Sequence, residues 1–239
     1  MKTIEIQKIP INNYNFNQFL AILNKRLDNN EKTFVVTGNP ELIMYAHAHR
    51  EYEKILKEAD YITPDGIGVV IASKIIHKPL QERVAGFDLM NALLANAEEK
   101  GLKVYLLGAK ESTLEKTHDH MKRKHPRLKI VGKHHGYFDI DDEKIVNEMI
   151  QLEPDLIFVA LGFPKQEFWI HKHMQHFQKG LFMGVGGSFD VWAGEVKRAP
   201  EIWIKFHLEW FYRLLKQPSR FKRMLVLPQF LFKVLKERK

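Results

Sequence analysis

Short apolar segments alternate with longer segments of helical periodicity along most of this 239-residue chain. The short segments are apolar at successive positions, which is typical of strands buried on both faces. Predicted strands cover residues 33–37, 60–63, 103–107, 129–131, 155–161 and 181–185. Predicted helices cover residues 40–58, 67–76, 86–100, 112–124 and 164–178, with another that begins at Asp141 or Asp142. This alternation predicts an α/β fold, a Rossmann-like parallel sheet flanked by helices.

Several predicted helices carry local signals at their ends. Asn39 suits an N-cap and Pro40 suits the first helical position that follows it. Ser112 is expected to cap the helix over 112–124, and Pro164 is expected to begin the helix over 164–178. Gly101 follows the last position of the 86–100 helix, where glycine commonly ends a helix.

The pattern changes in the last sixth of the chain. Residues 201–216 form a predicted helix rich in aromatic side chains, and Pro218 and Pro228 are expected to break the rest into two further short helices. We therefore divide the chain into an α/β core, residues 1–199, and a basic, aromatic-rich helical appendage, residues 200–239.

Composition narrows the class of protein. Hydrophobic residues make up 45% of the chain and charged residues 28%, which excludes a disordered or collagen-like chain. No segment reaches the roughly 18 uncharged apolar residues of a membrane-spanning helix, and residues 1–10 do not resemble a secretory signal. The absence of cysteine excludes disulfides and thiolate chemistry. We expect a cytoplasmic protein.

Charge is distributed unevenly. The chain carries +8, of which residues 200–239 carry +7, with ten basic and three acidic side chains. Within this segment Arg213, Lys216, Arg220 and Arg223 have helical spacing beside apolar positions, although Pro218 interrupts the series. Such a segment favours a polyanionic partner, and its apolar neighbours favour a membrane surface over nucleic acid.

Polar and glycine-rich clusters follow the predicted strands. In parallel sheets, ligands bind at the carboxyl ends of the strands, so these clusters predict one shared site. They are Thr37-Gly38-Asn39, Pro64-Asp65-Gly66, Gly108, Gly162–Gln166 and Gly186–Asp190.

Two of these clusters carry candidate chemistry. Asp65 could act as a catalytic carboxylate at a strand end, or could simply belong to a Pro-Asp-Gly turn or cap the helix that follows. Gly184–Ser188 could bind a phosphate through backbone N–H groups or be an ordinary tight turn. It is not a dinucleotide-binding fingerprint, because Phe189 occupies the place of the third glycine.

Metal binding is not predicted. Asp139-Ile140-Asp141 matches the Asp-x-Asp pair of many sugar transferases, but the same acidic residues would serve to cap a helix. The twelve histidines show no metal-ligand spacing with a carboxylate partner.

Taken together, the motifs resemble one family. The chain resembles the WecG/TagA/CpsF glycosyltransferases from about Thr33 to Arg223. The ordered blocks are Thr37–Glu41, Pro64–Gly68, Glu82–Leu89, Leu106–Gly108, His135–Phe138, Ala160–Glu167, Gly184–Asp190, Ala193-Gly194, Lys197–Pro200 and Leu208–Leu214.

The resemblance implies transfer of N-acetylmannosamine from its UDP ester to the 4-hydroxyl of lipid-linked N-acetylglucosamine, with inversion and without a metal or cofactor. It implies that Asp65 is the general base and that Thr37 and Gln166 line the active site. It places three arginines in a membrane-directed appendage, at the inner face of the cell membrane. They are Arg213, Arg220 and Arg223.

Loss of UDP would leave negative charge on the diphosphate, which cations and helix N-termini must stabilise in the absence of a metal. Candidates are the helix start at Asn39, the Gly186-Gly187 turn and the appendage arginines. Asp190 and Tyr137 are candidates for holding the nucleoside.

Other functions remain open on sequence alone. A related transferase could use the uronic acid form of the donor, with Arg83 or Lys165 pairing with the extra carboxylate. A nicotinamide-dependent oxidoreductase and a non-catalytic lipid- or nucleic-acid-binding module are the alternatives of another class. The oligomeric state is open, a homo-oligomer included.

Overall fold

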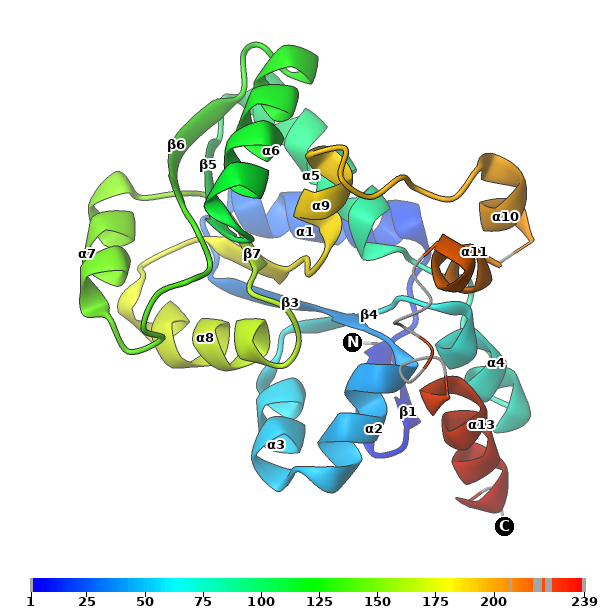
Figure 1. Cartoon of the computed structure of the whole chain (residues 1–239). Coiled ribbons are helices and arrows are strands. Elements are labelled where there is room, and N and C mark those ends of the chain that lie inside the picture. The colour runs from blue at the N-terminus through cyan, green and yellow to red at the C-terminus, as the bar shows by residue number, and fades with distance from the viewer. Residues whose placement is uncertain (1, 207, 217–220, 222–224, 238–239) are drawn as a thin grey trace.

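The computed structural model describes residues 2–206, 208–216, 221 and 225–237, with the side chains of Arg213 and Glu237 left out. Its centre is a six-stranded sheet of order β4-β3-β8-β7-β5-β6, in which every neighbouring pair is parallel (Figure 1). The strands are β3 (Thr33–Gly38), β4 (Tyr61–Pro64), β5 (Lys103–Gly108), β6 (Lys129–His134), β7 (Leu156–Ala160) and β8 (Leu181–Gly184). The predicted α/β fold is confirmed.

Helices cover both faces of this sheet, which explains why its strands are apolar at successive positions (Figure 1). On β3, Val35 packs with the helices of one face, whereas Phe34 and Val36 pack with those of the other. The first face carries α1 (Phe16–Asp28), α5 (Gly86–Lys100), α6 (Glu111–Lys124) and α9 (Ser188–Trp192). The second face carries α2 (Pro40–Ala48), α3 (Arg50–Glu58), α4 (Ile67–Ile75), α7 (Glu143–Leu152) and α8 (Lys165–His173).

An N-terminal hairpin adds to the second face and was not predicted. Strands β1 (Thr3–Ile6) and β2 (Ile9–Asn12) pair antiparallel, and their alternate isoleucines are buried in the core. The Asn12 side chain accepts a hydrogen bond from the backbone N–H of Ile62 over 2.7 Å, which ties the hairpin to β4. The period of two in this segment indicates a half-buried strand pair, a pattern distinct from that of the central sheet.

Some predicted helix boundaries were wrong. The helix expected over 40–58 is divided into α2 and α3 because His49 has extended backbone angles, φ −130° and ψ 98°. Helix α6 begins one residue before Ser112, and no side chain caps it. Helix α8 ends at His173 and continues only as a short 3-10 turn, Met174–His176.

The C-terminal segment consists of α10 (Glu201–Lys205), α11 (Glu209–Lys216) and α13 (Val226–Glu237). The single helix predicted over 201–216 is therefore two helices. Pro228 does not break α13, because it lies in the first turn, where its missing N–H removes no intrahelical hydrogen bond. Pro218 lies outside the described residues.

Helix α13 packs against α2 and α4 and completes the core of the second face. Phe230 is 0% exposed and Val234 is 1% exposed, and both belong to the same hydrophobic cluster as the strands. The division at residue 200 stays a prediction, but at least this helix is an integral part of the packed molecule. No helix in the described ranges is both long and apolar enough to cross a membrane.

Candidate active site

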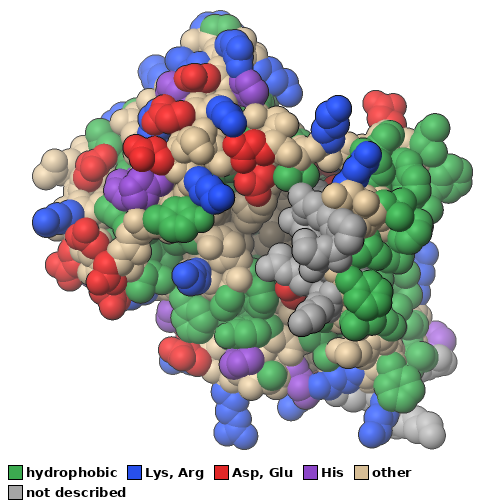
Figure 2. All heavy atoms as spheres, in the orientation of Figure 1, with side chains coloured by type: hydrophobic (Ala, Val, Ile, Leu, Met, Phe, Trp, Pro, Cys, Tyr) green, Lys and Arg blue, Asp and Glu red, His purple; other side chains and the backbone are tan. Residues whose placement is uncertain are grey.

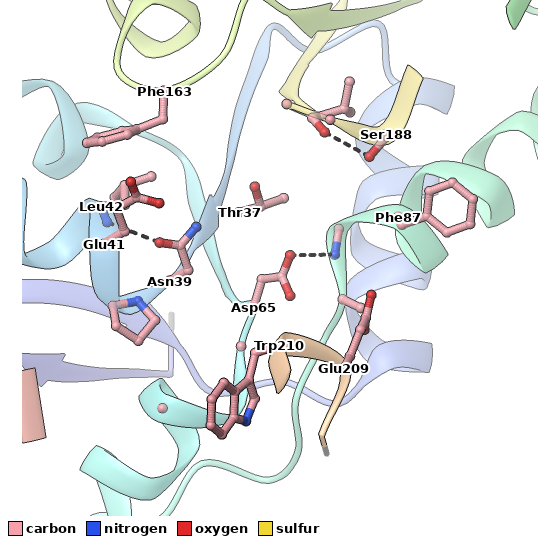
Figure 3. A pocket seen from close by; sticks show the side chains of 18 of the residues that line it. Thr37, Asn39, Glu41, Leu42, Asp65, Phe87, Phe163, Ser188, Glu209 and Trp210 are labelled. Carbon is pink, nitrogen blue, oxygen red and sulfur yellow. Dashed lines mark hydrogen bonds between the residues drawn. The ribbon is translucent and has the colours of Figure 1, made fainter. Parts of the chain in front are cut away.

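A cavity of about 390 Å³ opens at the carboxyl edge of the sheet. Residues that follow β3, β4, β7 and β8 line it, together with Arg83 and parts of α11 and α13. Figure 3 shows Asn39, Asp65, Phe163 and Glu209 around this cavity. The space-filling view shows the hollow in the middle of this face of the molecule (Figure 2). Eight predicted site residues line it: Thr37, Asn39, Asp65, Arg83, Gln166, Gly186, Gly187 and Asp190. The structure thus brings residues of four predicted strand-end clusters together, whereas Gly108 of the fifth is not among the described lining residues. Their functional roles stay predictions.

Asp65 is fixed at the end of β4 by its backbone, whose N–H donates to the carbonyl oxygens of Gly38 and Thr63 over 2.8 and 2.9 Å. Its Oδ2 accepts a hydrogen bond from the backbone N–H of Gly86 over 3.1 Å (Figure 3). Oδ1 lies 3.4 Å from Nη2 of Arg83. The carboxylate thus sits at the N-terminus of α5, whose dipole stabilises negative charge. With 26% of the side chain exposed, Asp65 can still meet a ligand in the cavity.

Gly86 must be glycine for this arrangement to form. A Cβ atom there would lie 2.4 Å from Cγ2 of Thr37, a distance that real Cβ atoms do not adopt. The Thr37 hydroxyl in turn donates to the carbonyl oxygen of Gly184 over 3.3 Å, which links the ends of β3 and β8. The absent side chain therefore lets the start of α5 approach both Thr37 and Asp65.

Arg83 connects Asp65 to the C-terminal segment. Its Nη2 donates to Oε2 of Glu209 over 2.9 Å, and the Glu209 side chain is only 8% exposed. Burial alone would lower the pKa of Arg83, but the neighbouring charges of Asp65 and Glu209 raise it, so the guanidinium is charged. Glu209 was not predicted from the sequence as a site residue. The sequence signal that could have identified Glu209 is that it is an acidic residue inside a strongly basic segment.

Gln166 and Glu167 form a buried pair behind the glycine turn. Nε2 of Gln166 donates to Oε1 of Glu167 over 2.7 Å, and Oε1 of Gln166 accepts from the backbone N–H of Gly186 over 3.1 Å. That N–H is therefore engaged within the protein rather than directed at a phosphate. Burial raises the pKa of the Glu167 carboxyl to about 7. Glu167 was also not identified from the sequence as a site residue.

Helix α2 directs its N-terminus at the cavity. Asn39 caps the helix by accepting a hydrogen bond from the backbone N–H of Leu42 over 3.0 Å, and Pro40 occupies the first turn, as predicted (Figure 3). Because Asn39, Pro40 and Glu41 all line the cavity, the positive end of the dipole of this nine-residue helix faces the cavity, where it suits an anionic group.

The described cavity lining carries more acidic than basic side chains. The acids are Glu41, Asp65, Asp190 and Glu209, and the bases are Arg83 and Arg198. Both arginines have carboxylate partners, since Arg198 donates to Asp88 over 2.7 Å. Neither base in this lining therefore presents an unpaired cation to a ligand.

Comparison with known proteins decides the family. The profile of the glycosyl transferase WecG/TagA/CpsF family matches residues 4–239. The chain belongs to the WecG/TagA/CpsF glycosyltransferase family. The resemblance inferred from the ordered motifs is confirmed.

Three relatives of this WecG/TagA/CpsF family member carry one name, N-acetylglucosaminyldiphosphoundecaprenol N-acetyl-beta-D-mannosaminyltransferase. The protein from Bacillus spizizenii is 44% identical over 237 residues, 97% of this chain and 92% of the relative. The protein from Bacillus subtilis is 40% identical over 240 residues, 100% of this chain and 93% of the relative. The protein from Staphylococcus aureus is 41% identical over 206 residues, 86% of this chain and 81% of the relative.

Five predicted site residues of this family member are not placed at the cavity. Tyr137 is 70% exposed, and neither it nor Lys165 belongs to the described lining. Arg213 lies in α11, but its side chain is outside the described part of the structure. Arg220 and Arg223 lie outside the described residues altogether. Their roles stay predictions.

The two acids of Asp139-Ile140-Asp141 have local structural roles. Oδ1 of Asp139 accepts from the backbone N–H of Asp141, and Asp141 forms an ion pair with Lys172. Asp142 caps α7 through a hydrogen bond from the backbone N–H of Lys144 over 2.9 Å. In the ranges that the structure describes, no group of three or more His, Asp or Glu side chains could hold a metal ion.

Proposed function

We propose that this protein transfers N-acetylmannosamine from UDP-N-acetylmannosamine to the 4-hydroxyl of N-acetylglucosamine on diphospho-undecaprenol, with inversion to a β-1,4 linkage. This reaction belongs to the synthesis of the wall teichoic acid linkage unit. The family match and the shared name of relatives 40–44% identical to the chain support the activity. The structural observation that supports this activity most strongly is the carboxylate of Asp65, which lies in a cavity at the carboxyl edge of the sheet.

Asp65 is the proposed general base. The acceptor hydroxyl must lose its proton as its oxygen attacks the anomeric carbon of the donor, and a positioned carboxylate can accept that proton. The bond between the anomeric carbon and the diphosphate breaks, and its electron pair leaves with UDP. The hydrogen bond from Gly86 and the contact with Arg83 hold the carboxylate in place for this step.

Charge that develops on the departing diphosphate requires stabilisation. The N-terminus of α2 is the favoured donor, because its first-turn residues line the same cavity as Asp65. Appendage arginines are further candidates from the sequence. We propose no metal for this step.

The cavity supports a neutral donor sugar. An N-acetylmannosamine uronate would bring an additional carboxylate into a lining that already holds four acidic side chains. Arg83, one of the cations considered for that carboxylate, already contacts Asp65 and Glu209. Lys165, the other, is not in the described lining.

We also propose that the protein acts at the membrane surface that holds its lipid-linked acceptor. Among the residues that the structure describes, eleven large hydrophobic side chains are exposed, and nine of them belong to the C-terminal segment. They gather on the side of the molecule formed by α4, α10, α11 and α13 (Figure 2). The nine are Ile202, Phe206, Leu208, Phe211, Leu215, Phe221, Leu225, Phe232 and Leu235, and we call them the apolar C-terminal face. Such a face beside basic residues suits a bilayer interface.

An Asp65→Asn variant tests the proposed base. The amide keeps the size of the carboxylate but cannot accept the proton, so we expect transfer to fall by at least about 100-fold. Binding of UDP-N-acetylmannosamine, measured by calorimetry, should remain. The matched control is Asp139→Asn, a change of the same kind at an exposed position outside the described cavity lining. An Asp65→Asn enzyme with the wild-type rate would contradict the assignment.

The activity itself is tested by a radiolabel transfer assay with a lipid-diphosphate-linked N-acetylglucosamine acceptor. UDP-N-acetylmannosamine and its uronate are offered separately, each with and without a chelator. We expect transfer from the neutral donor only, at the same rate in both conditions. Transfer from the uronate would reject the proposed donor, and loss of activity with the chelator would reject the metal-free mechanism.

A further inference from the structure

A buried carboxylate from the C-terminal segment lies beside the proposed base. Glu209 begins α11, 126 residues after Arg83, and its Oε2 accepts a hydrogen bond from Arg83 Nη2 over 2.9 Å. The same Nη2 lies 3.4 Å from Oδ1 of Asp65. The three charged groups therefore form a row that runs from α11 to the cavity. Figure 3 shows the two carboxylates of this row, Asp65 and Glu209, on the same side of the cavity.

The burial of Glu209 requires an explanation. Its side chain is 8% exposed in a helix whose Phe211 and Leu215 are exposed, the reverse of the usual distribution. A buried carboxylate is costly unless a cation and hydrogen bonds compensate it, and Arg83, itself 15% exposed, supplies both. The pair thus binds the start of α11 to the wall of the cavity.

The guanidinium of Arg83 is held by these two carboxylates and by no other hydrogen bond within the described residues. Its buried Nε has no hydrogen-bond partner there. The contact with Glu209 is the shorter by 0.5 Å, so Glu209 is the closer of the two partners that hold the guanidinium. Without Glu209, the guanidinium would be free to turn its unused donors onto Asp65 and form a closer, bidentate pair.

We propose that Glu209 is a positioning residue for the transfer reaction. Glu209 holds Arg83 where the guanidinium orients Asp65 without occupying the carboxylate that must accept the proton. Helix α11 thereby contributes to the catalytic site through Arg83, and its neighbours on the apolar C-terminal face place that contribution at the proposed membrane surface. This inference rests on the proposed function of Asp65.

The first test is a Glu209→Gln variant, which keeps the shape and one hydrogen-bond acceptor but removes the charge. We expect kcat to fall about 10- to 100-fold, the range of a lost hydrogen bond to a charged group. KM for UDP-N-acetylmannosamine should change less than about threefold. Glu209→Asp, which restores the carboxylate on a shorter side chain, should recover part of kcat. Glu201→Gln, the same change at an exposed position of the same segment, is the matched control.

A double-mutant cycle separates this role from a purely structural one. If Glu209 acts through Arg83, then Glu209→Gln should cause little further loss in an Arg83→Lys background. Single turnovers with enzyme in excess keep slow variants measurable. A wild-type kcat in Glu209→Gln would overturn the proposal. It would also be overturned if Glu209→Gln lowered kcat by the same factor in the wild type and in the Arg83→Lys background.

The outcome of Asp65→Asn distinguishes the failure of this inference from failure of the proposed function. An inactive Asp65→Asn with a fully active Glu209→Gln rejects only the positioning role. An active Asp65→Asn rejects the base itself and this inference with it. Far-UV circular dichroism and thermal unfolding identify a variant that has lost its fold, in which case Glu209→Asp decides the result.

Discussion

At the scale of single residues, a buried carboxylate supports the glycine turn at Gly186-Gly187. Glu167 is 0% exposed and accepts a hydrogen bond from Gln166, which in turn holds Gly186 of the glycine turn. The carboxyl group is therefore part of the wall behind the cavity rather than a surface acid. Burial raises its pKa from 4.5 to about 7, so its protonation changes within the ordinary working range of pH.

The raised pKa of Glu167 predicts a pH-dependent stability. The unfolded chain ionises this carboxyl near pH 4.5, while the folded protein retains the proton up to about pH 7. Its contribution to the free energy of unfolding therefore falls as the pH rises through that window and stays constant above it. The fall is on the order of 3 kcal/mol. Glu167→Gln should lack it, because the amide still accepts from Gln166 but does not ionise.

Urea unfolding at pH 5 and pH 7.5 measures this difference. The free energy of unfolding of Glu167→Gln, taken relative to that of the wild type, should be about 2–3 kcal/mol higher at pH 7.5 than at pH 5. Wild type at each pH is the control for all other titrating groups. Parallel pH dependences of the two proteins would show that Glu167 does not titrate in this window.

At the scale of elements, α13 shows how the C-terminal segment is joined to the rest. One side of this helix is buried against α2 and α4, whereas Phe232 and Leu235 on other sides are exposed. Gly68 of α4 permits the approach, because a Cβ there would lie 2.4 Å from Cδ1 of Leu227. The helix therefore has one face in the core and another on the apolar C-terminal face.

A pair of phenylalanines on α13 tests this orientation. Phe230→Ala removes a ring that is 0% exposed and should destabilise the protein by about 3–5 kcal/mol through loss of burial and creation of a cavity. Phe232→Ala removes a ring that is 71% exposed and should change stability by less than about 0.5 kcal/mol. Urea unfolding of both variants is the measurement. Equal effects would contradict the packing of α13.

At the scale of the whole molecule, charge and exposed apolar surface share one segment. Residues 200–239 carry +7 of the net +8 and also the apolar C-terminal face. The cavity opens beside the same segment, because Glu209, Trp210, Val226 and Leu227 line it. A membrane bound to this face would therefore present a lipid-linked acceptor close to Asp65.

Vesicle binding tests this arrangement. Replacing Phe206 and Phe232, 70% and 71% exposed, by serine should weaken binding to anionic vesicles by at least about tenfold, because insertion of both rings into the interface is lost. Binding should also weaken with added salt, since the basic groups contribute about 1 kcal/mol each near an anionic surface. Co-sedimentation measures both effects.

The matched control is Tyr137→Ser, which removes an equally exposed ring, 70%, outside the apolar C-terminal face. It should bind vesicles as wild type does. If the control and the double variant lose binding equally, the membrane surface lies elsewhere on the molecule.

The sequence by itself determined how the central strands and helices follow one another along the chain, since buried strands leave short apolar segments and helices leave segments of helical periodicity. It also determined the caps at Asn39 and Gly101, because each depends on a few neighbouring residues. The gathering of strand-end clusters such as Asp65 at one edge followed from the parallel sheet.

Only the tertiary structure decided which distant groups meet. The Arg83–Glu209 pair joins residues 126 apart, and Gln166 bonds to Gly186 across 20 residues. No local pattern specifies such contacts, because they depend on how the helices dock against the sheet. The burial of Phe230 likewise depended on the close approach of α13 to α4 rather than on the sequence of α13 alone. Local periodicity encodes elements, whereas the site arises where those elements pack.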